Sequence, residues 1–202
     1  MKSESIAFGI AGIAFGLIAG WIIGTQQAPS RQAAAPAAAA SAPAQANTRA
    51  AVLDETKVTA LKSVAEREPA NAKPRIDLGN LYFDAERYPD AITWYEAALK
   101  LSPKDVNLST DLGVCYYYTN QPDKALVQFD KSLAIDPKHP KTLLNVGIVR
   151  AFGKQDLKGA TESWQKVLAQ APSSEEARAA RQALDGLRSA HPDLNIPAPE
   201  GQ

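Results

Sequence analysis

The residues best suited to chemistry are few and scattered in this chain of 202 residues. His139 and His191 are its two histidines, and Cys115 is its one cysteine. The sequence has no HExxH zinc motif, no glycine-rich phosphate loop and no GxSxG nucleophile motif. A single cysteine can form neither an intramolecular disulfide nor a cysteine cluster for zinc. We therefore predict no catalytic residues, no metal and no cofactor: the protein is not expected to be an enzyme.

The sequence contexts of His139 and Cys115 also argue against catalysis. His139 lies in "DPKHPK", which predicts a turn, and we interpret it as an exposed polar residue beside a proline. Cys115 lies in "LGVCYYY", within a predicted helix, where a small buried thiol is expected rather than a nucleophile. The function is therefore expected to reside in a binding surface.

The charge composition argues against nucleic acid as a partner. The chain has 22 Lys and Arg residues against 22 Asp and Glu residues. A protein that holds phosphate backbones by general charge would show a basic excess or a basic stripe, and the sequence has neither.

Near the N-terminus lies a segment that predicts a membrane anchor. After a flank of residues 1–5, residues 6–23 carry no charge, and at 1.5 Å per residue such a helix is about 27 Å long. We expect the anchor, residues 6–24, to be retained, because Ala28 and Ala35, the candidate cleavage sites, each precede a proline. Lys2 on one side and Arg31 on the other weakly favour a cytoplasmic N-terminus. This predicts a single-pass protein of the inner (cytoplasmic) membrane with a periplasmic soluble domain.

Four glycines recur at every fourth position of this segment: Gly12, Gly16, Gly20 and Gly24. Small residues on one stripe let two membrane helices approach closely, so this glycine face predicts a homo-oligomer or docking onto another membrane helix. An ordinary glycine-rich anchor is the alternative.

Two segments have the composition of extended, mobile chain. Residues 25–50 are rich in Ala, Pro, Gln and Ser and predict a linker, because they offer too little apolar surface to offset the entropy of ordering. Residues 190–202 predict a flexible tail.

The middle of the chain repeats itself every 34 residues. Prolines recur at Pro69, Pro103 and Pro137, and the next follows 35 residues later at Pro172. Other positions repeat in step, in the series Gly79, Gly113 and Gly147, the series Ala91, Ala125 and Ala160, and the series Tyr95, Phe129 and Trp164. We place the one extra residue of the third unit in the turn around "GKQDLKG".

This period and these positions resemble the tetratricopeptide repeat. The resemblance covers residues 72–105, 106–139 and 140–174, and it implies an all-α solenoid in which each repeat is a hairpin of two helices. We expect Gly79 and Ala91 to let the two helices of a hairpin close, and Tyr95 to fill the space toward the next repeat. Proline cannot continue a helix and is expected at the turns between repeats.

Helices that cap the solenoid are expected at both ends of the tetratricopeptide-repeat domain, residues 51–189. The first, residues 51–68, reads as the second helix of an incomplete repeat. The second, residues 174–189, should start at a capping box of Ser173 and Glu176 and has one apolar face with Ala177, Ala180 and Leu184. The prediction is eight helices outside the membrane.

In the family that this sequence resembles, the first helix of each repeat lines a concave groove that binds partners. The resemblance maps that groove onto Ile76, Asn80, Phe83, Asp84, Asn107, Thr110, Val114, Tyr117, Tyr118, Lys141, Leu144, Ile148 and Phe152, together with Lys73 and Ala151. Some members clamp a C-terminal carboxylate there, but Val114 and Ile148 stand where that clamp would need further polar groups. Alternatively, the aromatic residues pack against each other. Arg150 stands where the other repeats have Tyr82 and Tyr116, as a groove contact or as a local weakening.

These features together predict a membrane-anchored scaffold or adaptor. It would bind a protein or peptide segment in its groove and assist the assembly of a membrane or envelope complex, with an avidity raised by the anchor. Two alternatives stay open: a structural, self-oligomerising membrane element, and an accessory subunit of a membrane enzyme system. The plan of anchor, linker and repeats resembles bacterial repeat subunits used in cytochrome c biogenesis.

Overall fold

A computed structural model describes residues 51–192 of the chain. The chain divides into two units, residues 1–49 and 50–202, and all the described residues belong to the second. The predicted anchor, its glycine face at Gly12, Gly16, Gly20 and Gly24, the linker and most of the tail lie outside the described residues. Within residues 51–192, none of the helices has the length and apolar character needed to span a bilayer.

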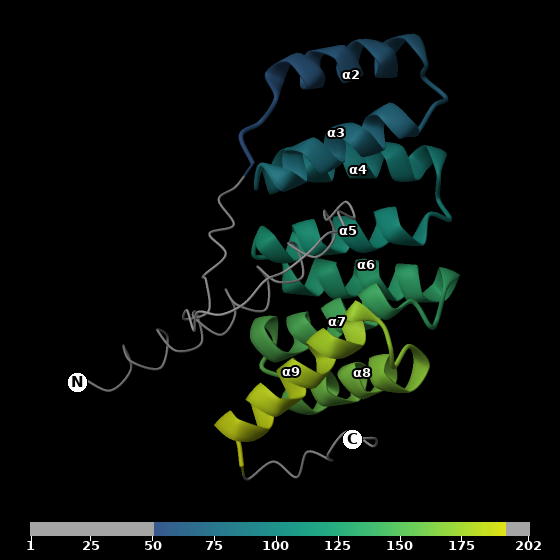
Figure 1. Cartoon of the computed structure of the whole chain (residues 1–202). Helices are drawn as coiled ribbons and strands as arrows, with labels where there is room; N and C mark the ends of the chain where they lie inside the picture. The colour runs from purple at the N-terminus through teal and green to yellow at the C-terminus, as the bar shows by residue number, and fades with distance from the viewer. Residues whose placement is uncertain (1–50, 193–202) are drawn as a thin grey trace, which may run out of the picture. The chain divides into compact units, whose positions relative to one another are not determined.

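The second unit is a stack of antiparallel helices (Figure 1). Helix α2 (Glu55–Arg67) precedes three hairpins and α9 (Glu175–Ala190) follows them. The hairpins are α3 (Lys73–Asp84) with α4 (Tyr88–Leu101), α5 (Val106–Tyr118) with α6 (Pro122–Ile135), and α7 (Pro140–Ile148) with α8 (Leu157–Gln170); a π-helical turn, η1 (Val149–Gly153), extends α7. The prediction of an all-α solenoid with eight α-helices is confirmed for residues 51–192, which contain no strand.

Side-chain caps and proline set the starts of these helices. The carboxylates of Asp54, Asp105 and Asp156 accept N–H bonds in the first turns of α2, α5 and α8. Proline occupies the first turn of α3, α4, α6 and α7, where its missing N–H costs nothing. At α9 the predicted capping box is wrong by one residue. Ser174, not Ser173, is the cap, and its hydroxyl accepts the N–H of Ala177.

Each repeating glycine lies against the repeating aromatic residue of its own hairpin. A Cβ at Gly79 would overlap the ring of Tyr95, and Gly113 stands in the same relation to Phe129. The ring of Tyr95 thus fills space within its own hairpin, and it also belongs to the apolar cluster that contains Leu108 and Leu112 of the next repeat, as predicted. Because interiors are close-packed, the glycine and the aromatic ring specify each other, which explains their fixed spacing.

The extra residue of the third repeat lies upstream of its predicted place. The turns after α5 and η1 each contain one residue with a left-handed backbone, Asn120 and Gln155, and these are 35 positions apart. Gly113 and Gly147 are still 34 apart. The insertion therefore lies between Gly147 and Gln155, where Val149–Gly153 form the wider turn of a π-helix. The chain absorbs the residue inside the first helix of the hairpin rather than in the turn around "GKQDLKG".

The core is apolar between the first and second repeats, whereas between the second and third it combines a smaller apolar cluster with buried polar side chains. One hydrophobic cluster joins α2, α3, α4 and α5 and includes Leu78, Tyr95, Leu108, Leu112 and Cys115. A smaller cluster joins α6 to α7 and η1 through Ala125, Phe129, Val146 and Val149. Buried hydroxyl and amide side chains lie between α5, α6 and α7: Ser109, Thr110, Gln128, Ser132 and Thr142.

The buried thiol predicted at Cys115 is confirmed, and burial raises its pKa well above the usual range. A nucleophilic cysteine needs the opposite shift.

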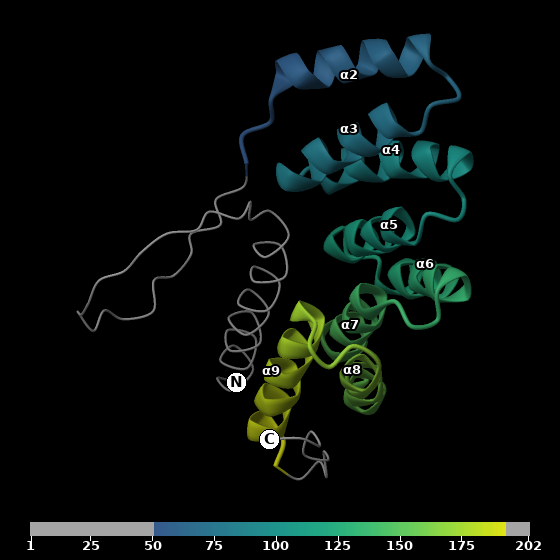
Figure 2. The same ribbon diagram turned by 45° about the vertical axis from the view of Figure 1, so that its right-hand side comes forward.

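Helix α9 lies against both helices of the third hairpin. Figures 1 and 2 show it crossing beside α7 and α8, at an angle to the regular stack. Its predicted apolar face is confirmed, since Ala177, Ala180 and Leu184 are buried. One end of the solenoid is therefore covered by a helix that presents charged side chains to solvent.

Candidate binding face

The predicted groove residues lie on α3, α5, α7 and η1, the first helices of the three repeats. We call this surface the first-helix face. Asn80 and Asn107 are exposed on it, and eight further positions are half-buried: Ile76, Phe83, Asp84, Val114, Tyr117, Tyr118, Lys141 and Phe152. Lys73, at the start of α3, is also exposed. The first two repeats thus present most of the accessible positions.

In the third repeat, the predicted groove positions are mostly covered. Leu144 and Ile148 are 2% and 4% exposed, and Ala151 is buried as well. These residues belong to the part of the solenoid against which α9 packs. Thr110 in the second repeat is also fully buried. Thr110, Leu144 and Ile148 therefore do not line an open surface.

The half-buried aromatic residues of the face contact one another through Tyr88, the first residue of α4. The ring of Phe83 meets Tyr88 edge to face with centroids 5.5 Å apart, and Tyr88 stacks on Tyr118 at 4.5 Å. Tyr117 lies beside Tyr118 at 6.0 Å. This is the packing alternative left open above, and it ties the first repeat to the second. Sequence reasoning missed Tyr88, because that position holds Pro122 and Leu157 in the other repeats.

Burial of these phenols disfavours their ionised forms. It raises the pKa of Tyr117 and of Tyr118 to about 12, so both are neutral hydroxyls at physiological pH. The cluster can therefore offer apolar ring surface and hydrogen-bonding hydroxyls, but no charge.

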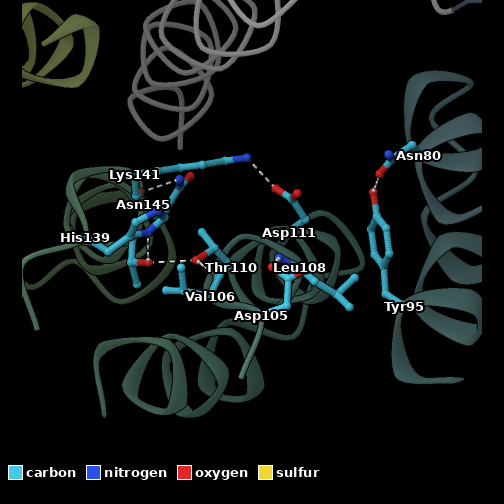
Figure 3. Close-up of polar contacts among 11 residues, drawn as sticks. Asn80, Tyr95, Asp105, Val106, Leu108, Thr110, Asp111, His139, Lys141 and Asn145 are labelled. Atoms are coloured by element: carbon cyan, nitrogen blue, oxygen red, sulfur yellow. Dashed lines mark hydrogen bonds and ion pairs between the residues drawn. The ribbon is translucent and has the colours of Figure 1, made fainter. Parts of the chain in front are cut away.

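Both lysines predicted for the face are paired with aspartates. The Nζ of Lys141 donates to Asp111 Oδ1 at 2.6 Å, across the junction of α5 and α7 (Figure 3). Lys73 pairs with Asp77 one turn away on α3, at 2.9 Å. Desolvation raises the pKa of Asp111, while the adjacent Lys141 opposes the rise. Sequence reasoning missed Asp77 and Asp111, although they occupy equivalent positions of successive repeats.

Asn80 receives a hydrogen bond from beneath the face. The hydroxyl of Tyr95, whose residue is only 2% exposed, donates to Asn80 Oδ1 at 2.8 Å (Figure 3). Desolvation, and next the Asp111 carboxylate, raise the pKa of this phenol well above its usual value. Asn80 and Tyr95 are therefore bonded to each other, and Asp111 acts on Tyr95 through its charge alone.

His139 is half-buried, so its predicted exposure is wrong. Its Nδ1 lies 2.7 Å from Thr142 Oγ1, which lies 2.7 Å from Thr110 Oγ1. Thr110 donates its one hydroxyl hydrogen to the carbonyl of Val106, so it must accept from Thr142. Thr142 in turn must accept from His139, which fixes the hydrogen on Nδ1. The imidazole thus holds a structural network at the junction of α5 and α7.

Arg150 is not on the first-helix face. One of its guanidinium nitrogens donates to the carbonyl of Gly159 at 3.4 Å and lies 4.0 Å from the Asp156 carboxylate. The arginine therefore connects α7 and its π-turn to the start of α8. Within residues 51–192, no three His, Cys, Asp or Glu side chains are grouped so that they could hold a metal ion.

The sequence matches models of the tetratricopeptide repeat. A model described as a TPR repeat matches residues 79–120, and one described as the tetratricopeptide repeat matches residues 108–139. The helical hairpins and their period agree with these matches. The chain therefore contains tetratricopeptide repeats. No curated protein matches it.

Solved structures with similar folds share little sequence with this chain. The structure of MamA superposes with a TM-score of 0.57 at 19% identity, covering 67% of this chain and 81% of MamA. The first TPR domain of Spaghetti (RPAP3), bound to the HSP90 peptide SRMEEVD, gives 0.54 at 24% identity, with 59% and 94% covered. The Yersinia enterocolitica type III secretion chaperone SycD, in complex with a peptide of the translocator YopD, gives 0.53 at 18% identity, with 58% and 89% covered. These likenesses show the fold.

Proposed function

We propose that this tetratricopeptide-repeat protein is a non-enzymatic scaffold that binds a segment of another protein on the first-helix face of its first two repeats. The observation that carries the proposal is the composition of that face. Asn80 and Asn107 are exposed beside the half-buried apolar side chains of Ile76, Val114 and Phe83. Apolar anchors beside amide groups suit an extended peptide, whose side chains and main chain need both.

The charges of the face specify the kind of segment. Because Lys73 and Lys141 are already paired with Asp77 and Asp111, a carboxylate ligand would meet lysine charges that aspartates already neutralise. Asp84 adds another carboxylate to the same surface. The partner segment is therefore uncharged and apolar rather than acidic. Structural neighbours that hold the HSP90 peptide and the YopD peptide support peptide binding as a use of this fold.

Membrane attachment is a further part of the proposal. The apolar run of residues 6–23 would hold the repeats at the inner membrane, with the soluble domain in the periplasm. There the anchor would raise the local concentration of the repeats and assist the assembly of a membrane or envelope complex. Gly12, Gly16, Gly20 and Gly24 would let two copies associate.

Photo-crosslinking in the native membrane tests this function. A probe at Asn107, which is exposed on the first-helix face, should give an adduct that maps to one segment of one partner protein. A probe at Val127, which is 56% exposed on α6, is the matched control and should not give that adduct. The same adducts from both probes, or adducts with the same chain alone, would contradict the proposal.

A further inference from the structure

The pairing of Asn80 with Tyr95 is confined to the first repeat. In the second repeat the equivalent pair is Val114 and Phe129, and in the third it is Ile148 and Trp164. The indole N–H of Trp164 donates to the carbonyl of Leu144 instead of to the residue at position 148. Of the three repeats, the first is therefore the one with an amide, Asn80, at this position of the first-helix face. It is also the one whose buried aromatic residue, Tyr95, has a hydroxyl.

Packing alone does not require the Tyr95 hydroxyl. The rings of Tyr95 and Phe129 lie against Gly79 and Gly113 in the same way, and Phe129 has no polar atom. A phenol at a site where phenylalanine packs equally well adds a polar group that needs a partner. The Tyr95 hydroxyl and the Asn80 amide thus occur together in the first repeat, and each is the hydrogen-bond partner of the other.

This hydrogen bond determines which way the amide of Asn80 faces. The phenol hydrogen needs an acceptor, so the amide oxygen turns toward Tyr95 and the amide nitrogen turns away from the ring (Figure 3). Among residues 51–192, no acceptor is bonded to that nitrogen, and Asn80 is exposed. Asp111 and Lys141, which are bonded to each other, lie along the same face in Figure 3.

We infer that the Tyr95 hydroxyl is a positioning group that holds the Asn80 amide with its two N–H donors toward the first-helix face, where they bind a main-chain carbonyl of the partner segment. The inference rests on the proposed function and names the atom of the partner that Asn80 recognises. A carbonyl fits because two N–H donors require an acceptor, while Asp111 already neutralises Lys141 and Asp77 already neutralises Lys73. A main-chain carbonyl is present in every peptide, so Asn80 gives affinity, and the apolar contacts beside it give selectivity.

Orientation is tested on the full chain in detergent micelles, with ¹⁵N-labelled asparagine. In the unchanged protein, the Asn80 side-chain amide should have a higher order parameter than that of Asn107, an exposed asparagine on the same face. Tyr95→Phe keeps the ring on Gly79 and should lower the Asn80 value to that of Asn107. Tyr116→Phe is the control, because its hydroxyl donates to Glu96 away from this site. An Asn80 amide that is as mobile before the substitution as after it would overturn the inference.

Binding is tested with peptides selected by the full chain from a phage library of random heptapeptides without Asp, Glu, Lys or Arg. Tyr95→Phe should weaken the dissociation constant of a selected peptide about three- to tenfold, the effect of one impaired hydrogen bond. Asn80→Ala should weaken it at least as much, while Tyr116→Phe should leave it unchanged. Equal affinity in the Tyr95→Phe and unchanged proteins would overturn the inference.

A different outcome would instead contradict the proposed function. If no peptide is selected although the Asn80 amide is ordered, Tyr95 positions an amide that has no peptide to bind. The ligand assigned here would then be wrong, and the orientation would stand as a feature of the fold alone.

Discussion

The junction between the first and second repeats and the junction between the second and third repeats join the same kind of hairpin in two different ways. The first is closed by apolar side chains, with Leu108 and Leu112 of α5 in one cluster with Tyr95 of α4. The second combines a smaller apolar cluster between α6 and α7 with hydroxyls, an imidazole and an ion pair between α5 and α7. Repeat proteins are held together by such nearest-neighbour interfaces. The difference shows that one solenoid can be joined mainly by hydrophobic burial at one junction and by less burial with added directional bonds at the next.

Directional bonds have a consequence that burial lacks. A hydrophobic contact tolerates small rotations, whereas a chain of hydrogen bonds is made in one geometry and leaves buried donors unpaired when it breaks. We therefore expect the second junction to set the angle between the second and third repeats. We expect the first junction, with its larger apolar cluster, to contribute more to the free energy of unfolding.

The largest expected effect is a truncation in the apolar junction. Leu108→Ala removes a side chain that is 3% exposed and should lower the free energy of unfolding by about 2–5 kcal/mol. Urea unfolding of the full chain, followed by circular dichroism, measures the change. Val127→Ala, at an exposed position of α6, is the control and should change the free energy by less than about 0.5 kcal/mol. A loss below about 1 kcal/mol for Leu108→Ala would contradict the assignment of stability to this junction.

A smaller effect is expected from the hydroxyls of the polar junction. Thr110→Val leaves the hydroxyl of Thr142 without its acceptor and should cost about 1–3 kcal/mol. Adding Thr142→Val removes that unpaired hydroxyl, so the double variant should be more stable than Thr110→Val alone. A double-mutant cycle by urea unfolding gives the coupling between the two. Strictly additive costs would show that the two hydroxyls are not bonded.

The smallest effect is a pH dependence from His139. Burial lowers the pKa of this imidazole below its ordinary value of 6.5, with Lys141 acting the same way and Asp136, Glu176 and Asp111 opposing. The unfolded chain then binds a proton at a higher pH than the folded one. Stability should be constant above about pH 6.5 and fall as the pH drops toward the folded pKa, by at most about 1.4 kcal/mol per unit.

His139→Asn tests this dependence, because asparagine keeps a donor near the Nδ1 position and cannot titrate. The variant should show a smaller loss of stability between pH 7 and pH 5 than the unchanged chain. His191→Asn, at the C-terminal end of α9, is the control and should keep the full loss. Equal pH profiles for His139→Asn and the unchanged chain would contradict the account.

Much of the solenoid could be predicted from the sequence because its rules are local or periodic. Proline and glycine act through their own backbones, and a period of 34 residues places each glycine opposite an aromatic residue wherever the pattern recurs. The thiol of Cys115 and the apolar face of α9 follow from helical spacing in the same way. The prediction failed where the structure differs from it by one residue and no neighbouring residue in the sequence indicates the difference. The π-turn at Val149–Gly153 and the cap at Ser174 are two such cases.

The candidate site was less predictable, because exposure depends on what packs over a residue. Ile148 has the same helical position as Asn80 and Val114, which are accessible, and it is covered at the end of the solenoid where α9 packs. Leu144 shares its position with Thr110, which is also buried. Asp111 and Tyr95 matter through contacts with residues on other helices, Lys141 and Asn80, which no local pattern reveals.

By itself, the sequence determined that this chain forms helical hairpins, how many, and with what period, because these properties depend on backbone preferences and on apolar residues at regular intervals. Only the tertiary structure decided which first helices stay accessible, that Lys141 is paired with Asp111, and which way the Asn80 amide faces. Those features depend on distances between side chains far apart in the chain. Such distances exist only after the repeats have stacked.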